Sequence, residues 1–132
     1  MFFEMTYQVR VLDYEEGIRW YTTFFNREAD FTPHEGFAEW EMLPGCWLQV
    51  AEGQPTQGSG PMRLAVVDLE DEVRRMQETL EIVEIEAFSR DEVPVKWTTF
   101  SDPWGNRIGL FEYRNKLEEQ QRINELRPNK QN

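Results

Sequence analysis

Few side chains in this sequence could perform acid–base, nucleophilic or metal chemistry. His34 is the only histidine and stands in a Pro-His-Glu-Gly stretch that predicts a turn, where an exposed histidine is the usual outcome. Cys46 has no histidine near it in sequence to activate its thiol, so we expect a small buried hydrophobe. Glu39 and Glu41 alternate along one strand and could reach a cation, although exposed strand carboxylates are commoner. No general base has a definable partner, which argues against an enzyme.

Composition and charge narrow the class of protein. The chain has 132 residues, enough for one domain with a real core. Its 25 acidic and 14 basic residues give a net charge of −11, which opposes nucleic-acid binding because a phosphate backbone requires a basic surface. The acidity either favours a cationic small molecule or only keeps the protein soluble. With one cysteine, no signal peptide and no long apolar run, the sequence predicts a cytoplasmic protein without an internal disulfide.

The segment SDPWGNRIGLFEY, residues 101–113, combines a tight turn with a strand. Asp102 and Pro103 set the turn, and Gly105 and Asn106 complete it because both tolerate a positive φ. The side chains after the turn alternate between two faces, with Ile108 and Leu110 on one and Arg107, Gly109 and Phe111 on the other. A glycine in mid-strand usually marks the close approach of a ligand or of another backbone.

The first half of the chain reads as a strand, a helix and three more strands. From Met5 onward one strand face is apolar and the other polar, formed respectively by Tyr7, Val9 and Val11 and by Thr6, Gln8 and Arg10. Asp13 is the expected N-cap of a helix that ends near Asn26 and carries an apolar stripe. Strands are predicted over residues 29–32, 37–42 and 47–51.

The second half repeats this order after a polar linker at residues 52–61. A strand is predicted over residues 62–67, followed by a helix capped by Asp68. Further strands follow at 82–88 and 95–100, and the segment 101–113 supplies the last one. The sequence VLDYEE at 11–16 is answered by VVDLED at 66–71, which indicates an internal duplication.

The duplicated strand–helix–three-strand order, together with the SDPWGNRIGLFEY ending, resembles the glyoxalase and bleomycin-resistance family of the vicinal oxygen chelate superfamily. The resemblance implies an α+β fold in which two βαβββ modules form a curled, eight-stranded mixed sheet around a cleft, commonly in a homodimer. We expect one such domain at 1–113, with repeats at about 5–51 and 62–112, and a C-terminal helix with a frayed tail at 114–132.

The resemblance also implies where a metal would bind. Enzymes of the family hold a divalent metal through four cleft-facing side chains, and these positions correspond here to Thr6, Gln49, Met62 and Gly109. Such metals need imidazole, carboxylate or thiolate donors, which none of these four residues supplies. The sequence therefore predicts neither a metal nor another cofactor.

The expected cleft combines hydrogen-bonding groups with an apolar wall, as small-molecule sites do. Its predicted ligand-binding residues are Thr6, Gln8, Arg10, Trp47, Gln49, Met62, Leu64, Arg107, Gly109 and Phe111. The arginines would suit a carboxylate or phosphate, whereas the net charge suits a cation, and the polar residues of the first strand could also simply face water.

Three functions follow from this prediction. The first is a metal-free protein that binds and sequesters a cationic or amphipathic compound. The second is a metal-dependent lyase or dioxygenase of the same superfamily with an atypical site. The third is an interaction module without any ligand, and no nucleic acid or membrane is expected as a partner in any of them.

Overall fold

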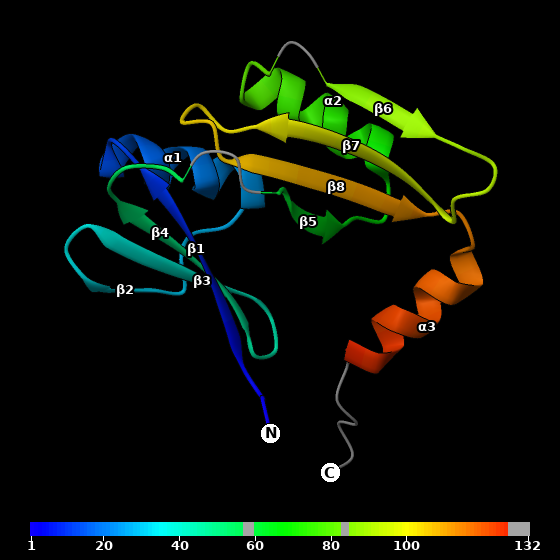
Figure 1. Cartoon of the computed structure of the whole chain (residues 1–132), viewed down its shortest axis with the longest axis horizontal. Coiled ribbons are helices and arrows are strands. Elements are labelled where there is room, and N and C mark those ends of the chain that lie inside the picture. Colours follow the sequence, from blue (N-terminus) through cyan, green and yellow to red (C-terminus); the bar gives the residue numbers. More distant parts are fainter. Residues whose placement is uncertain (57–59, 83–84, 127–132) are drawn as a thin grey trace.

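The computed structural model describes residues 1–56, 60–82 and 85–126, and it contains two mixed sheets of four strands each with three helices (Figure 1). The first module consists of β1 (Met5–Val11), α1 (Tyr14–Phe25), β2 (Phe31–His34), β3 (Phe37–Leu43) and β4 (Cys46–Glu52). The second consists of β5 (Met62–Ala65), α2 (Leu69–Thr79), β6 (Glu86–Ser89), β7 (Val95–Ser101) and β8 (Arg107–Tyr113), and α3 (Lys116–Leu126) follows.

The two sheets have the same topology, which confirms the duplication and the α+β class. Their strand orders are β1-β4-β3-β2 and β5-β8-β7-β6. In each sheet the first strand of the module, β1 or β5, lies at one edge and pairs in parallel with the last strand, β4 or β8. The bounds of several strands differ from the prediction, among them those of β2, β5 and β6. His34 ends β2 instead of lying in the turn, and β6 begins only at Glu86. The expected frayed tail lies outside the described residues.

Both modules start their helix at the predicted aspartate. Asp13 Oδ1 accepts a hydrogen bond from the Glu16 backbone N–H at 3.1 Å, and Asp68 Oδ1 accepts one from the Asp71 backbone N–H at 3.0 Å. Each bond satisfies a backbone donor that the first helical turn leaves without a partner. Asn26 adopts a left-handed conformation with φ 56° and ends α1, as its sequence position suggested.

One hydrophobic core is shared by the two modules. Phe24 of α1 packs edge-on against Phe100 of β7, with ring centroids 5.8 Å apart. Arg75 of α2 donates to the backbone carbonyls of Thr23 and Phe24 at 2.8 and 2.6 Å, which also satisfies carbonyls at the end of α1. The modules therefore lie side by side and are joined through α1, as Figure 1 shows.

Gly17 allows α1 to approach β1 closely. A Cβ atom at Gly17 would lie 2.5 Å from Cγ2 of Val11, far inside van der Waals contact. Gly17 is buried and Val11 is fully buried, so neither residue can move into solvent to relieve the overlap. A glycine in the middle of a helix costs about 1 kcal/mol in propensity, and here that cost is offset by closer packing on the sheet.

Asp102 connects the turn before β8 to the first module. Its Oδ1 accepts from the backbone N–H groups of Trp104 and Asn106, both at 2.9 Å. Its Oδ2 accepts from the Asn106 side chain at 2.8 Å and from the Tyr21 hydroxyl at 2.7 Å. The Asn106 side chain also donates to the carbonyl of Arg10 at 2.9 Å. This set of hydrogen bonds around Asp102 is called the joint below.

The joint accounts for the residue types of the turn. Gly105 has φ 88°, a conformation that side chains disfavour, as the sequence predicted. Asn106 is needed instead for its amide, which bridges Asp102 and β1. Tyr21 is fully buried, and its pKa is raised well above the ordinary 10.0, first by burial and then by the adjacent Asp102.

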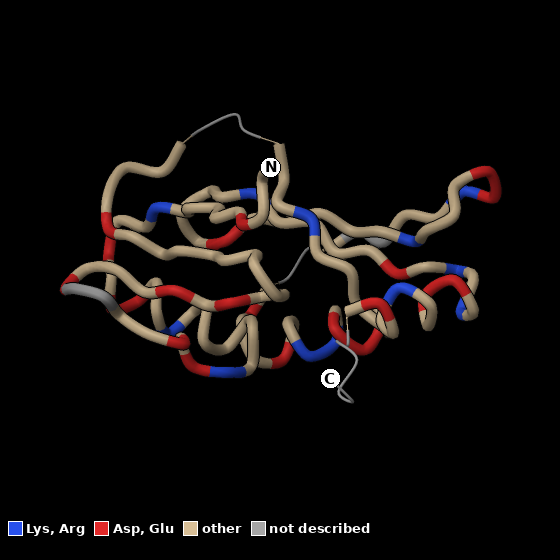
Figure 2. Tube along the Cα trace, turned by 90° about the horizontal axis from the view of Figure 1, so that it is seen from below, with Lys and Arg blue, Asp and Glu red and all other residues tan. Residues whose placement is uncertain are grey.

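Charged residues are spread over the whole molecule. Figure 2 shows acidic and basic residues interspersed along both modules, without one continuous basic stripe. No helix among the described residues is long and apolar enough to cross a membrane.

Candidate functional site

A row of amide and charged side chains crosses the exposed face of the first sheet. Gln8 and Gln49 stand opposite each other in the parallel β1–β4 register, and Gln8 Nε2 donates to Gln49 Oε1 at 3.2 Å. Arg10 Nε donates to Gln8 Oε1 at 3.1 Å, and Gln49 Nε2 donates to Glu39 Oε1 at 3.1 Å. The structure thus brings three predicted site residues together. Glu39 joins them through Gln49, although sequence analysis considered it only as a cation ligand or an exposed strand carboxylate.

Trp47 forms the aromatic end of the same face. It stands opposite Thr6 in the β1–β4 register, and its ring packs edge-on against Phe31 with centroids 5.7 Å apart. Its indole N–H donates to the Glu4 carboxylate at 2.9 Å. Thr6 and Trp47 therefore share the predicted face with the amide row, which gives this face a polar and an aromatic part.

The corresponding face of the second sheet carries arginine, glycine and aromatic residues. Gly109 stands opposite Arg63 on one side and Thr99 on the other, and Phe111 stands opposite Trp97. Because alternate residues of a strand share a face, Arg107 lies on this face as well. A Cβ at Gly109 would lie 3.2 Å from Cγ and Nη1 of Arg63, so the Arg63 side chain lies over this glycine.

Met62 and Leu64 lie on the opposite face, contrary to the sequence prediction. They are in register with Ile108 and Leu110, which are buried in the core, and both pack against that core. Sequence analysis assigned the face of Met62 by counting residues back from the helix cap Asp68. Because β5 ends at Ala65, residues 66 and 67 do not continue the strand alternation, and the count is not valid across them. A phase error of one residue turns every side chain of a strand to the other face.

The residues at the implied metal positions do not fit a metal. Both ends of the Gln49 amide are engaged, Gly109 has no side chain, and Met62 faces the core. Arg63, which occupies the β5 position on the Gly109 face, is a cation and cannot coordinate one. Over residues 1–56, 60–82 and 85–126, no three His, Cys, Asp or Glu side chains are grouped to hold a metal ion.

The arginines of the two faces differ from most others in the molecule. Arg27, Arg74, Arg75 and Arg122 form ion pairs with carboxylates within three or four residues in sequence. Arg10, Arg63 and Arg107 are exposed and form no ion pair with any described residue. Their guanidinium groups are thus available to an anionic or hydrogen-bonding ligand.

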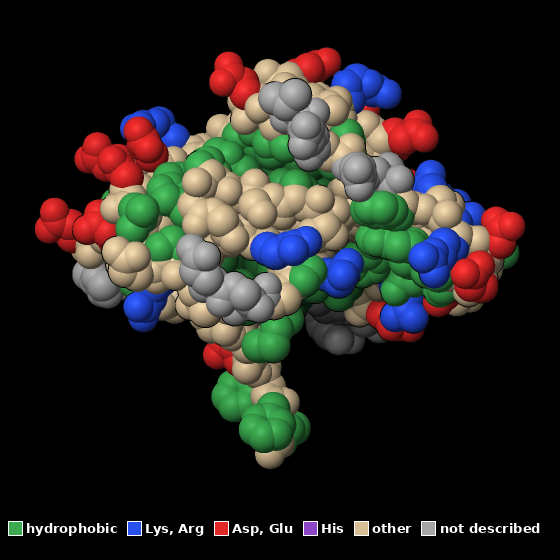
Figure 3. Space-filling model, turned by 45° about the horizontal axis from the view of Figure 1, so that its top comes forward, with side chains coloured by type: hydrophobic (Ala, Val, Ile, Leu, Met, Phe, Trp, Pro, Cys, Tyr) green, Lys and Arg blue, Asp and Glu red, His purple; other side chains and the backbone are tan. Residues whose placement is uncertain are grey.

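A groove of about 930 Å³ opens between the two modules and α3, and Trp47, Arg63 and Phe111 of the two strand faces also line it. Its lining is mostly apolar and includes Met5, Tyr7, Leu64, Ile123 and Leu126. The neighbouring segment 1–4 leaves the body of the molecule with Met1, Phe2 and Phe3 exposed. Figure 3 shows hydrophobic side chains gathered on this projection, below the rest of the surface. Four of the predicted ligand-binding residues, Trp47, Met62, Leu64 and Phe111, line this groove, whereas sequence analysis did not predict the wall contributed by α3.

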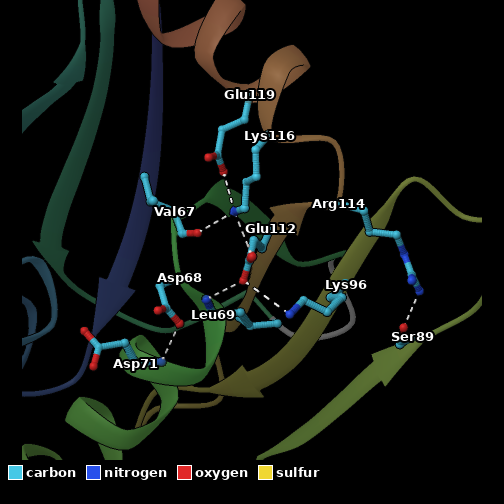
Figure 4. Close-up of polar contacts among 10 residues, drawn as sticks. All are labelled: Val67, Asp68, Leu69, Asp71, Ser89, Lys96, Glu112, Arg114, Lys116 and Glu119. Atoms are coloured by element: carbon cyan, nitrogen blue, oxygen red, sulfur yellow. Dashed lines mark hydrogen bonds and ion pairs between the residues drawn. The ribbon is translucent and has the colours of Figure 1, made fainter.

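Helix α3 is held at the groove by one buried carboxylate (Figure 4). Glu112 accepts from the Leu69 backbone N–H and from the Lys116 ammonium, both at 2.8 Å, and lies 3.6 Å from the Lys96 ammonium. Lys116 also donates to the carbonyl of Val67 at 2.9 Å. Burial alone would raise the pKa of Glu112, but these hydrogen bonds and lysine charges lower the pKa below its ordinary 4.5. Glu112 thereby joins β8, α2 and α3.

The structure thus consists of two βαβββ modules, each with a helix on one face of its sheet and polar and aromatic side chains on the other. No family model and no curated protein matches the sequence. Among solved structures, a glyoxalase/bleomycin resistance protein from Catenulispora acidiphila is 27% identical, covers 83% of this chain and 96% of its own, and superposes with a TM-score of 0.68.

Two further structures show the same fold at lower identity. Lactoylglutathione lyase from Agrobacterium tumefaciens is 17% identical over 82% of this chain and 91% of its own, with a TM-score of 0.64. A glyoxalase/bleomycin resistance protein from Albidiferax ferrireducens is 16% identical over 81% and 95%, with a TM-score of 0.63. The chain therefore has the fold of the glyoxalase and bleomycin-resistance proteins of the vicinal oxygen chelate family and resembles one of them in sequence at 27% identity.

Proposed function

We propose that this protein binds a small amphipathic molecule on its strand faces without a metal. The observation that carries the proposal is the residue set at the implied metal positions Thr6, Gln49, Met62 and Gly109, which offers no metal donor and has Arg63 beside Gly109. Trp47 on the first sheet and Phe111 and Trp97 on the second supply apolar contact beside these polar groups. This combination suits recognition of a ligand with a polar and an apolar part.

Native mass spectrometry of the purified protein tests the metal-free state. We expect masses of the bare chain or its dimer, with or without a small organic adduct, and no change in melting temperature on adding a chelator. One divalent metal per chain, together with a lower melting temperature after chelation, would contradict the proposal, because a ligand specific to the native state stabilises it.

The alternative of a metal-dependent lyase or dioxygenase is supported only by the names of structural neighbours. Those activities depend on their own sites, and a shared fold does not transfer them. The donor set described above does not fit the metal that such chemistry would require. An interaction module without ligand is distinguished by a complete lack of small-molecule binding.

We also propose that two copies associate through the apolar groove and the segment 1–4. β1 and β5 are both edge strands with one unpaired side, and such edges favour pairing with another chain. Met1, Phe2 and Phe3 have relative exposures of 108%, 104% and 82%, and Met5 at the groove has 64%. Insertion of this segment into the groove of a second copy would remove apolar surface from water on both sides.

Light scattering after size exclusion measures this association. We expect a dimer at about 100 μM, and we expect Phe2→Ser combined with Phe3→Ser to weaken the association at least about tenfold. Leu117→Ser is the matched control, because Leu117 is 78% exposed but does not line the groove. A monomer at this concentration, or equal effects of the control and the double variant, would contradict the proposed interface.

A further inference from the structure

We infer that the face of the second sheet around Gly109 binds the acidic group, a carboxylate or a phosphate, of an apolar ligand, with Arg63 and Arg107 as its direct contacts. The inference rests on the proposed small-molecule function and specifies the ligand class. It departs from the expectation of a cationic compound, which the net charge of −11 and the family resemblance had suggested.

The backbone register places the two arginines around a position without a side chain. Arg63 is opposite Gly109 on the neighbouring strand, and Arg107 precedes Gly109 by two residues on the same strand face. Adjacent strands are about 4.8 Å apart and same-face neighbours along a strand about 7 Å apart, so both guanidinium groups can reach one bound anion. The space above Gly109 is filled by the flexible Arg63 side chain, whose Cγ and Nη1 would lie 3.2 Å from a Cβ there, so an anion would bind where the Arg63 guanidinium turns outward toward Arg107.

The local charges on this face are positive, although the molecule is acidic. Arg63 and Arg107 have no carboxylate partner among the described side chains. At physiological ionic strength charges are screened within about 8 Å, so the net charge of −11, which is spread over the whole chain, does not cancel these two guanidinium groups at one position.

Aromatic rings adjoin the two arginines on the same face. Phe111 follows Gly109 by two residues and stands opposite Trp97 in β7. Its ring packs edge-on against Tyr113 with centroids 5.8 Å apart, and Trp97 stacks on Phe88 at 5.7 Å. A ligand whose acidic group lies at Gly109 would therefore place its apolar part against Phe111 and Trp97. The class that fits is an aryl or alkyl carboxylate or phosphate.

The test uses four probes with one naphthalene ring: 2-naphthoate, 2-naphthyl phosphate, 2-naphthylmethylammonium and 2-naphthylmethanol. Affinities are measured by calorimetry, and the backbone amide of Gly109 is followed in ¹⁵N–¹H spectra. We expect one of the two anions to bind at least about tenfold more tightly than the cation and the alcohol, and to shift the Gly109 amide signal. The tighter anion identifies the acidic group as carboxylate or phosphate.

Variants assign the binding to the two arginines. Arg63→Gln and Arg107→Gln are each expected to weaken anion binding about fivefold to twentyfold, and their melting temperatures should equal that of the parent. Arg19→Gln is the matched control, because Arg19 is exposed on α1 and also lacks an ion pair with any described residue. It should leave anion binding unchanged.

The outcomes separate this inference from the proposed function. Equal or tighter binding of the cation or the alcohol, or anion binding that both arginine variants leave unchanged, overturns the acidic-ligand inference and leaves small-molecule binding in place. Failure of all four probes to bind below about 1 mM overturns both, and supports the interaction module without ligand.

Discussion

Replacement of Tyr21 by phenylalanine tests whether the joint holds the two modules together. The Tyr21 hydroxyl donates to Asp102 at 2.7 Å, and both residues are buried. Phenylalanine preserves the ring and therefore the aromatic contacts that Tyr21 makes with Trp20, Phe24 and Trp40. The substitution removes only the hydroxyl.

A hydrogen bond to a charged group contributes about 1.5–3 kcal/mol to stability. Asp102 keeps its three donors from the turn, so we expect a loss of about 2 kcal/mol in the free energy of unfolding. An unfolding entropy of about 2.1 cal/mol/K per residue gives about 0.28 kcal/mol/K for a chain of 132 residues. The melting temperature should therefore fall by about 7 °C.

Urea unfolding and thermal melting of the parent and Tyr21→Phe measure this loss. Tyr113→Phe is the matched control, since the Tyr113 hydroxyl makes no hydrogen bond within the described part of the chain, and its effect should stay within about 0.5 kcal/mol. Because the pKa of Tyr21 is raised in the folded state, its stabilisation is fully present below pH 10 and is lost as the pH rises further. The gap between parent and variant should thus narrow above pH 10. A Tyr21→Phe effect as small as that of the control would refute the role of the joint.

Three further substitutions probe features described above. Glu112→Gln should lower the free energy of unfolding by about 1–3 kcal/mol at neutral pH. Because the folded-state pKa of Glu112 is lowered, its stabilisation is present above about pH 4.5 and is lost as the pH falls through the folded-state pKa. The free energies of unfolding of parent and variant, measured with urea, should therefore converge over this pH range. Gly17→Ala should destabilise the protein by about 1–3 kcal/mol despite better helix propensity, and Val11→Ala in the same chain should restore part of the loss in thermal melts. Met62→His should destabilise the protein by about 1–3 kcal/mol and Arg63→His by less than about 0.5 kcal/mol, and the reverse order would contradict the register of β5.

The sequence predicted those elements whose signals are local. Asp13 and Asp68 mark helix starts because a capping aspartate acts within three residues of itself. The alternation in β1 and β8 was sufficient to assign their faces, because each strand has seven residues of mixed polarity. The duplicated topology followed from the order of these elements.

The features that sequence reasoning missed depend on contacts between distant segments. β5 has only four residues, so its phase is fixed by hydrogen bonding to β8 and could not be counted from Asp68. Asp102 was expected only to form a turn, and its bond to Tyr21 requires the packing of α1 on the second module. Glu112 was assigned no role, because nothing in sequence shows that Leu69 and Lys116 converge on it.

The joint also has a consequence for the order of folding. The Tyr21–Asp102 hydrogen bond links residues 81 positions apart, whereas most strand pairs within a module are much closer in sequence. Closing a long loop costs more chain entropy than closing a short one, and the cost is incurred before the contact forms. Each module should therefore assemble its own sheet first, and the joint should form as a late step that makes two similar half-domains unfold as one cooperative unit.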